Sequence, residues 1–157
     1  MSIVAVVGDC TTTTALALAA GWPSEHDAVV LEADRTGGSL AAWLGTPASP
    51  SLSTIVANSA AFGNSPSTVW SCVGTMVRDA PSGTRFIAAP VRSRAASRAL
   101  SEAGRTLFPL LAQLTEPTII ADIGPYAVAD VPPVLFSLAS SIVVCHRQDA
   151  ASSGAAT

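Results

Sequence analysis

The sequence contains no lysine, and all eight of its basic residues are arginine. This absence excludes every mechanism that needs a lysine, including a Schiff base to pyridoxal phosphate and the lysine contact of the usual phosphate-binding loop. Charge of either sign is scarce, since only 12% of the residues are charged and the net charge is −3. A nucleic-acid partner is therefore not expected, because its phosphates need a broad basic surface.

Long apolar runs and paired cysteines are also missing. No apolar run approaches the roughly 18 residues of a membrane span, and no basic segment precedes the first apolar run as it does in a secretory signal. Cys10, Cys72 and Cys145 are odd in number and far apart, and no C-x-x-C or Cys/His cluster accompanies them. We expect a cytoplasmic protein without a transmembrane segment, a disulfide framework or a zinc site.

Half of the arginines fall within one expected helix, at positions 92, 94, 98 and 105. Only Arg94 and Arg98 have the i,i+4 spacing that places two side chains on one helix face. The pattern favours a solvated helix face over a DNA-binding face.

Short β-branched runs alternate with helical segments along the chain. The alternation predicts right-handed βαβ units and an α/β fold with a doubly wound, mainly parallel sheet and helices on both faces. A threonine at the start of the first helix and Ser39 at the start of the second are expected to cap these helices. Strands are expected at residues 3–7, 28–31, 85–89, 118–122 and 141–145, and helices at residues 11–20, 40–44, 52–61, 68–78, 93–114 and 131–138.

The chain is expected to form one domain over residues 1–149, followed by a flexible tail over residues 150–157. In a sheet of the expected kind, ligands bind beyond the carboxyl ends of the strands. The residues at those ends are 8–12, 34, 90–93, 122–125 and 146–149.

Four segments of the chain carry a family resemblance. Residues 4–19 read V-A-V-V-G-D-C-T-T-T-T-A-L-A-L-A, and residues 29–45 read V-V-L-E-A-D-R-T-G-G-S-L-A-A-W-L-G. Residues 118–124 read T-I-I-A-D-I-G, and residues 147–152 read R-Q-D-A-A-S. They resemble the phosphate loop, the D-x-D segment, the Walker B strand and a later strand end of ParA/MinD-type P-loop ATPases, the deviant Walker A group of the SIMIBI class.

The resemblance is to a degenerate, C-terminally short member of the actinobacterial MinD/CpaE type, and it implies the three-layer sandwich of P-loop NTPases. The magnesium-binding positions correspond to Thr12, Asp34 and Asp122, and Asp34 is also the catalytic position, where it would orient the attacking water. The nucleotide-binding positions are those of the loop, the helix start and one strand end, namely Gly8, Asp9, Cys10, Thr11, Thr12, Thr13 and Asp122.

The loop departs from the family pattern in its charge. Thr11 stands at the lysine position, Cys10 at the preceding glycine and Val6 at the signature lysine, while Asp9 adds a negative charge. Each lost charge-assisted contact costs on the order of 1.5–3 kcal/mol. Two such losses and the added repulsion predict a polyphosphate affinity that is several orders of magnitude lower. Cys10 lies at a helix start, which activates a thiol, but an inert thiol is the favoured interpretation.

We expect a non-catalytic ParA/MinD-like domain that serves as a protein-interaction, positioning or regulatory module, in a setting such as cell division, partitioning, pilus placement or secretion. Its expected partner is another protein or a second copy of itself, and no cofactor is expected. One alternative is a residual ATPase that binds Mg-ATP through Thr12, Asp34 and Asp122 and takes an arginine from a partner. Another is a domain that binds an anion or small molecule at the helix start formed by residues 11–14.

Overall fold

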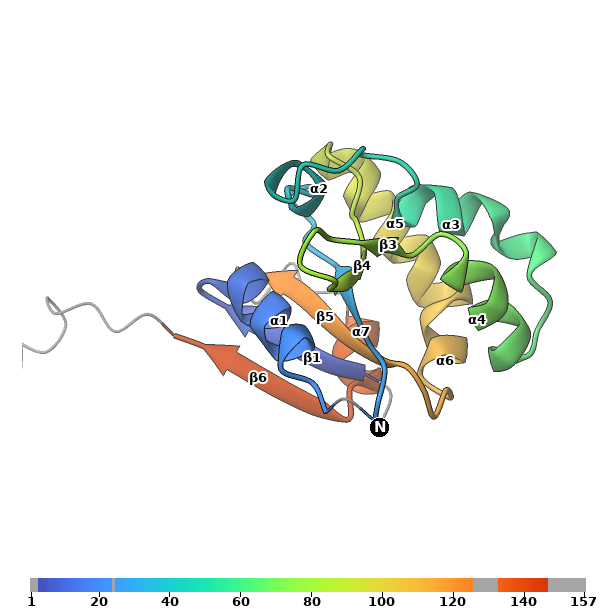
Figure 1. The fold of residues 1–157 in the computed structure, drawn as a ribbon. Helices are drawn as coiled ribbons and strands as arrows, with labels where there is room; N and C mark the ends of the chain where they lie inside the picture. The colour runs from blue at the N-terminus through green and yellow to red at the C-terminus, as the bar shows by residue number, and fades with distance from the viewer. Residues whose placement is uncertain (1–2, 24, 126–132, 147–157) are drawn as a thin grey trace, which may run out of the picture.

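The computed structural model describes residues 3–23, 25–125 and 133–146 (Figure 1). Its centre is a six-stranded sheet in the order β3-β4-β2-β5-β1-β6. Neighbouring strands run parallel except β3 and β4, which are antiparallel. The strands are β1 (Ile3–Gly8), β2 (Ala28–Glu32), β3 (Arg78–Asp79), β4 (Arg85–Ile87), β5 (Thr118–Gly124) and β6 (Ser141–Cys145).

Helices cover both faces of the sheet, so the described chain has three layers (Figure 1). One face carries α1 and α2, and the other carries α3 to α7. None of the helices in the described ranges has both the length and the apolar character needed to cross a membrane. The helices are α1 (Thr11–Ala20), α2 (Leu40–Trp43), α3 (Leu52–Asn58), the 3-10 turn η1 (Ser59–Ala61), α4 (Pro66–Gly74), α5 (Ser93–Thr106), α6 (Phe108–Leu111) and α7 (Pro133–Leu138).

Two hydrophobic cores arise because side chains alternate between the faces of a strand. On β2, Val29 and Leu31 join the core beneath α3 to α7, whereas Val30 joins the core beneath α1 and α2. The central strand β5 is buried along its whole length. A strand that is covered on both faces is apolar without alternation, and this is why the sequence predicts it well.

The structure confirms the α/β fold with a mainly parallel sheet and places a strand at each of the five expected positions. The first helix also has the expected bounds, Thr11–Ala20. The expected helix over residues 93–114 is divided at Leu107, because Pro109 has no N–H for a continuous helix and lies instead in the first turn of α6. The expected domain end at residue 149 and the tail over residues 150–157 lie outside the described residues.

The expected helix over residues 68–78 is wrong at its end. It stops at Gly74, and Arg78 belongs to β3, a strand that the sequence did not predict. The Arg78 guanidinium lies 5.5 Å from the centre of the Phe86 ring. It also donates to the Thr46 hydroxyl at 3.3 Å, to the carbonyl of Pro47 and to the carbonyl of Pro50 at 2.7 Å. These distant contacts override the local preference of the segment, which is weak for helix.

We predict that Arg78 fixes the loop between α2 and α3. Arg78→Met is expected to lower the free energy of unfolding by about 1–2 kcal/mol, because the Thr46 hydroxyl and the Pro50 carbonyl, which are part-buried, lose their charged donor. Arg78→Lys keeps the charge but lacks the fork that reaches three acceptors, so its loss should be intermediate. Urea denaturation of the three proteins measures the difference, and wild-type stability in both variants would contradict the prediction.

Candidate functional site

The candidate site lies at the carboxyl ends of β1 and β5, where the connections on either side cover opposite faces of the sheet. The connection from β1 through α1 to β2 covers one face, and α7, which follows β5 and precedes β6, packs on the other. The carboxyl ends of β1 and β5 therefore lie side by side at a topological switch point, the usual ligand crevice of such sheets. The structure thus brings the expected residues after β1 and those at the end of β5 together.

The loop between β1 and α1 is held by its backbone. Gly8 has φ +112°, and a Cβ at this position would lie 2.0 Å from the Cys145 carbonyl oxygen, so only glycine fits. The next N–H, of Asp9, donates to the same carbonyl at 2.9 Å. Cys10 then adopts a left-handed conformation with φ 56° and ψ 30°. Asp9 and Cys10 are exposed.

The expected threonine cap of α1 is wrong. Cys10 occupies the N-cap position, and no side-chain hydrogen bond caps the helix there. Thr14 instead donates its hydroxyl back to the Cys10 carbonyl at 3.1 Å. Thr11, at the position of the family lysine, is only 4% exposed, whereas Thr13 is exposed. Thr11 therefore places a short, buried hydroxyl side chain at the position where the resemblance implies a lysine.

Thr12 and Asp122 are in direct contact. The Thr12 hydroxyl donates to Asp122 Oδ2 at 2.6 Å, and the Gly124 N–H donates to Asp122 Oδ1 at 3.2 Å. The β1–β5 register shifts beside this carboxylate, from Val6 opposite Asp122 to Val7 opposite Gly124. Such an irregularity re-aims a side chain, here toward the start of α1. Two of the three expected magnesium ligands are therefore assembled.

Asp34 lies near the same strand end. Its Oδ1 accepts hydrogen bonds from the N–H and the hydroxyl of Thr36, both at 2.7 Å. A Cβ on Gly124 would lie 2.7 Å from the Asp34 carboxyl carbon, so the absence of a side chain at Gly124 makes room for this carboxylate. The third expected magnesium ligand is thus close to the Asp122 segment, but it is engaged by its own turn.

Sequence analysis missed the role of Glu32. This carboxylate is 2% exposed. Its Oε1 accepts the N–H groups of Ser39 at 2.7 Å and Leu40 at 2.8 Å, and its Oε2 accepts the N–H of Ala89 at 2.9 Å. Ser39 is the N-cap residue of α2 as expected, but its own side chain makes no capping bond. The helix is capped from a distance by Glu32, and no local pattern encodes such a contact.

The glycine pair that follows Asp34 serves the same arrangement. A Cβ on Gly37 would lie 2.3 Å from the Val91 carbonyl oxygen, and one on Gly38 would lie 2.4 Å from the Ala89 carbonyl oxygen. The Gly38 N–H donates to the Pro90 carbonyl at 2.8 Å. The G-G-S-L segment therefore lets the backbone before α2 pack directly on the end of β4. The contacts of Gly37 and Gly38 described here are with residues 89–91 of the same chain.

The site has an unbalanced negative charge. Within the described part of the chain, Glu32, Asp34 and Asp122 form no ion pair with an arginine. Burial raises the pKa of the Glu32 carboxyl above its ordinary value, although its three backbone N–H donors oppose the rise, and Asp122 adds to it. No group of three or more His, Cys, Asp or Glu side chains suited to a metal ion occurs among the residues that the structure describes.

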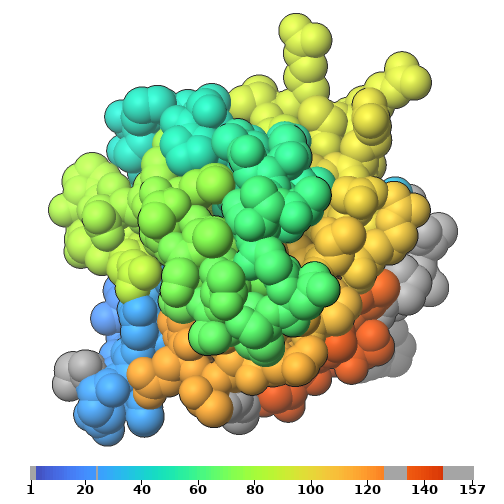
Figure 2. Space-filling view, turned by 90° about the vertical axis from the view of Figure 1, so that its right-hand side faces the viewer, coloured from blue at the N-terminus to red at the C-terminus, as the bar shows by residue number. Residues whose placement is uncertain are grey.

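A polar hollow lies away from this site, between α3 and α5. Its volume is about 540 Å³, and Figure 2 shows the face on which α3 and α5 lie side by side. Arg98 and Arg105 line it from α5, while Arg92 and Arg94 are exposed near the start of the helix. This agrees with the expected solvated helix face.

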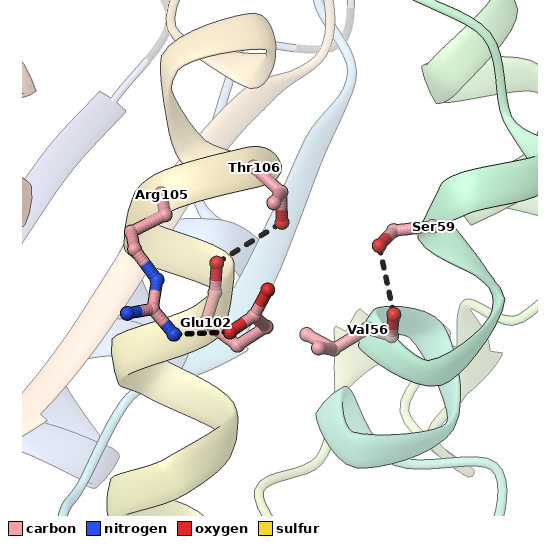
Figure 3. A network of polar contacts seen from close by, with 5 residues as sticks. All are labelled: Val56, Ser59, Glu102, Arg105 and Thr106. Carbon is pink, nitrogen blue, oxygen red and sulfur yellow. Dashed lines mark hydrogen bonds and ion pairs between the residues drawn. The ribbon is translucent and has the colours of Figure 1, made fainter.

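The polar contacts beside the hollow stay within each helical segment (Figure 3). Arg105 pairs with Glu102, and the Thr106 hydroxyl donates to the Glu102 carbonyl at 3.0 Å. Across the hollow, the Ser59 hydroxyl donates to the Val56 carbonyl at 2.8 Å. These bonds satisfy local groups and do not converge on a common point, so the hollow lacks the focused chemistry of an active site.

The fold and the site define a three-layer α/β protein with a cluster of polar side chains at the switch point of its sheet. A comparison with known protein families finds no match for this chain, and a comparison with curated proteins finds none either.

The raised pKa of Glu32 predicts a pH-dependent stability. A carboxyl whose pKa is higher in the folded than in the unfolded chain contributes most below its ordinary value of 4.5, and this contribution falls as the pH rises toward the folded pKa. Glu32→Gln removes the titration. The wild-type free energy of unfolding, minus that of the variant, is therefore expected to decrease from pH 4 upward, as measured by urea denaturation at each pH.

Glu25→Gln is the matched control, because Glu25 is exposed and the same exchange there removes one surface charge. Its difference from wild type is expected to change little over the same pH range. A wild-type advantage over Glu32→Gln that grows with pH would show that the backbone donors outweigh burial at Glu32.

Proposed function

We propose that this chain is a non-catalytic domain of the ParA/MinD ATPase type that acts through protein contacts rather than ATP hydrolysis. The mainly parallel sheet and the Thr12–Asp122 contact at the carboxyl ends of its strands support the family assignment. The proposal includes a cytoplasmic setting and a protein partner, which is another protein or a second copy of the chain.

The observation that carries the proposal is that the loop and the first turn of α1, residues 8–14, contain neither lysine nor arginine. A triphosphate in this crevice would face Asp122 and Asp34, and Asp9 is exposed in the loop itself. The lysine position is filled by the buried Thr11. Stabilisation of phosphoryl transfer comes almost entirely from positioning and charge neutralisation, so a loop without a fixed cation lacks the main catalytic contribution.

The carboxylates of Asp122 and Asp34 already accept hydrogen bonds from the chain. Asp122 is bound by Thr12 and by the Gly124 N–H, and Asp34 is bound by Thr36. A magnesium ion would have to displace the Thr12–Asp122 hydrogen bond and would still lack the lysine that shares the phosphate charge. The crevice is therefore better suited to holding the strand ends together than to turnover.

A second candidate function is residual Mg-ATP binding, and the Thr12–Asp122 contact favours it. These two residues occupy the positions of magnesium ligands in the resembled family. The Thr12 hydroxyl oxygen and Asp122 Oδ2 are 2.6 Å apart. Binding would then require an arginine supplied by a partner, in the manner of an arginine finger.

We predict that the isolated chain neither binds nor hydrolyses Mg-ATP. Isothermal titration calorimetry with Mg-ATP and Mg-ADP at concentrations up to about 1 mM should show no saturable heat, which corresponds to a binding free energy weaker than about −4 kcal/mol. Phosphate release should equal that of buffer. Saturable, magnesium-dependent heat that disappears in Thr12→Ala would support the second candidate and contradict the proposal.

A gain-of-function variant tests the electrostatic reason. Asp9→Gly removes the added carboxylate, Cys10→Gly restores one loop glycine and Thr11→Lys restores the cation, and glycine suits the left-handed conformation of position 10. Mg-ATP affinity should rise by at least about tenfold in this variant. A variant that keeps the wild-type circular dichroism spectrum but gains no affinity would show that charge is not what prevents binding.

A further inference from the structure

The two edges of the sheet differ in how they are protected. The β3 edge is two residues long, antiparallel, and formed by the charged Arg78 and Asp79. The β6 edge is five residues long and reads S-I-V-V-C, with no charge and no proline. Short charged edges prevent pairing between chains, whereas a long uncharged edge permits it. The β6 edge has none of these protective features.

The backbone of β6 offers hydrogen-bonding groups on its outer side. The Cys145 carbonyl accepts from Asp9, so the backbone groups of Cys145 face β1. Because these groups alternate along a strand, those of Ser141 and Val143 also face β1, and those of Ile142 and Val144 face the free edge. Within the described chain, β6 pairs with no strand other than β1.

Apolar side chains accompany these free groups. Ile142 is 51% exposed and Val144 is 74% exposed, and both point to the face that carries α7. They border a hollow of about 380 Å³ that Val7, Gly8 and Phe136 also line. Val143 and Cys145 point to the opposite face and pack on the core beneath α1. Within the described chain, the β6 edge therefore presents backbone N–H and C=O groups that no strand pairs with, and it is apolar on the face that carries α7.

We propose that β6 pairs with β6 of a second copy of this chain, antiparallel, with the two-fold axis at Val143. In this register Ile142 lies opposite the partner's Val144, and Val144 lies opposite the partner's Ile142. All four residues carry the outward N–H and C=O groups, so both pairs are hydrogen-bonded and every outward group of the strand finds its complement. Backbone pairing alone is independent of sequence, so the preference for a second copy rests on the side chains of this register.

The same register brings the exposed side chains together. Ile142 and the partner's Val144 lie on one face as a cross-strand pair of β-branched residues, an arrangement that stabilises antiparallel strands. The strand has no charge, so self-pairing opposes no like charges. The contact is isologous, closes at two copies and continues the sheet across both. It does not depend on the proposed loss of ATPase activity, since nucleotide binding and edge pairing are measured separately.

Sedimentation velocity over a concentration series tests the dimer. The wild-type chain is expected to reach twice its 15.8 kDa mass, and Val144→Lys is expected to raise the dimer dissociation constant by at least about tenfold. Val91→Lys is the matched control, because Val91 is 64% exposed but lies outside β6. A wild-type chain that stays monomeric, or equal weakening by both substitutions, would overturn the proposal.

A second variant tests the register and does not rely on a destabilising charge. The proposed axis places Ser141 opposite the partner's Cys145 in a pair that is not hydrogen-bonded, where the Cα atoms are about 4.5 Å apart and a disulfide fits. Ser141→Cys treated with oxidised glutathione is expected to give a covalent dimer on a non-reducing gel. Ser141→Cys combined with Cys145→Ser is expected to give none, and this control accounts for Cys10 and Cys72. A folded Ser141→Cys chain that forms no covalent dimer would refute the pairing.

Discussion

The carboxylate of Glu32 is the interaction on which the crevice depends. It joins three segments far apart in sequence, because it lies at the end of β2 and accepts N–H groups at the start of α2 and from Ala89, two residues after β4. A buried carboxylate is costly unless its oxygens are satisfied, and here backbone donors occupy both of them. The position of Asp34, two residues later, follows from this anchor, as does the close approach of Gly37 and Gly38 to the segment after β4. The part of the chain that most resembles a nucleotide-binding ATPase thus has a sufficient explanation in packing.

In the proposed function, the site has most of the expected ligand positions but lacks the positive charge that a polyphosphate needs. Thr12 and Asp122 meet, Asp34 is close by, and the loop turns through a left-handed residue before α1. Backbone donors and a helix dipole attract an anion, but Glu32, Asp34 and Asp122, which pair with no arginine of the described chain, repel it. Geometry is set by backbone contacts that tolerate changes of side chain, whereas charge depends on single residues. In the proposed function, a few substitutions would therefore remove the chemistry and leave the fold unchanged.

The sequence predicted those parts of the fold that local patterns encode. The β-branched runs gave all five major strands, and α1 was placed at its observed bounds because Gly21 and Pro23 follow a run of good helix formers. The failures share one cause. Arg78 leaves its helix for contacts with residues about 30 positions earlier, and Glu32 caps α2 and binds Ala89, 57 positions later. Likewise, the run at β6 reads like any other strand, and its exposure follows only from its place at the edge of the sheet. The site residues were found through resemblance, but their mutual engagement required three-dimensional geometry.

The contact between Gly8 and the Cys145 carbonyl links the crevice to the edge of the sheet. With no side chain between them, the two backbones lie as close as their atoms allow, and the Asp9 N–H fastens them at 2.9 Å. A sideways displacement of β6 is therefore expected to move Gly8 and Asp9 as well. Only Cys10 separates this fastened pair from Thr11, so the position of the outermost strand and the position of the start of α1 are coupled.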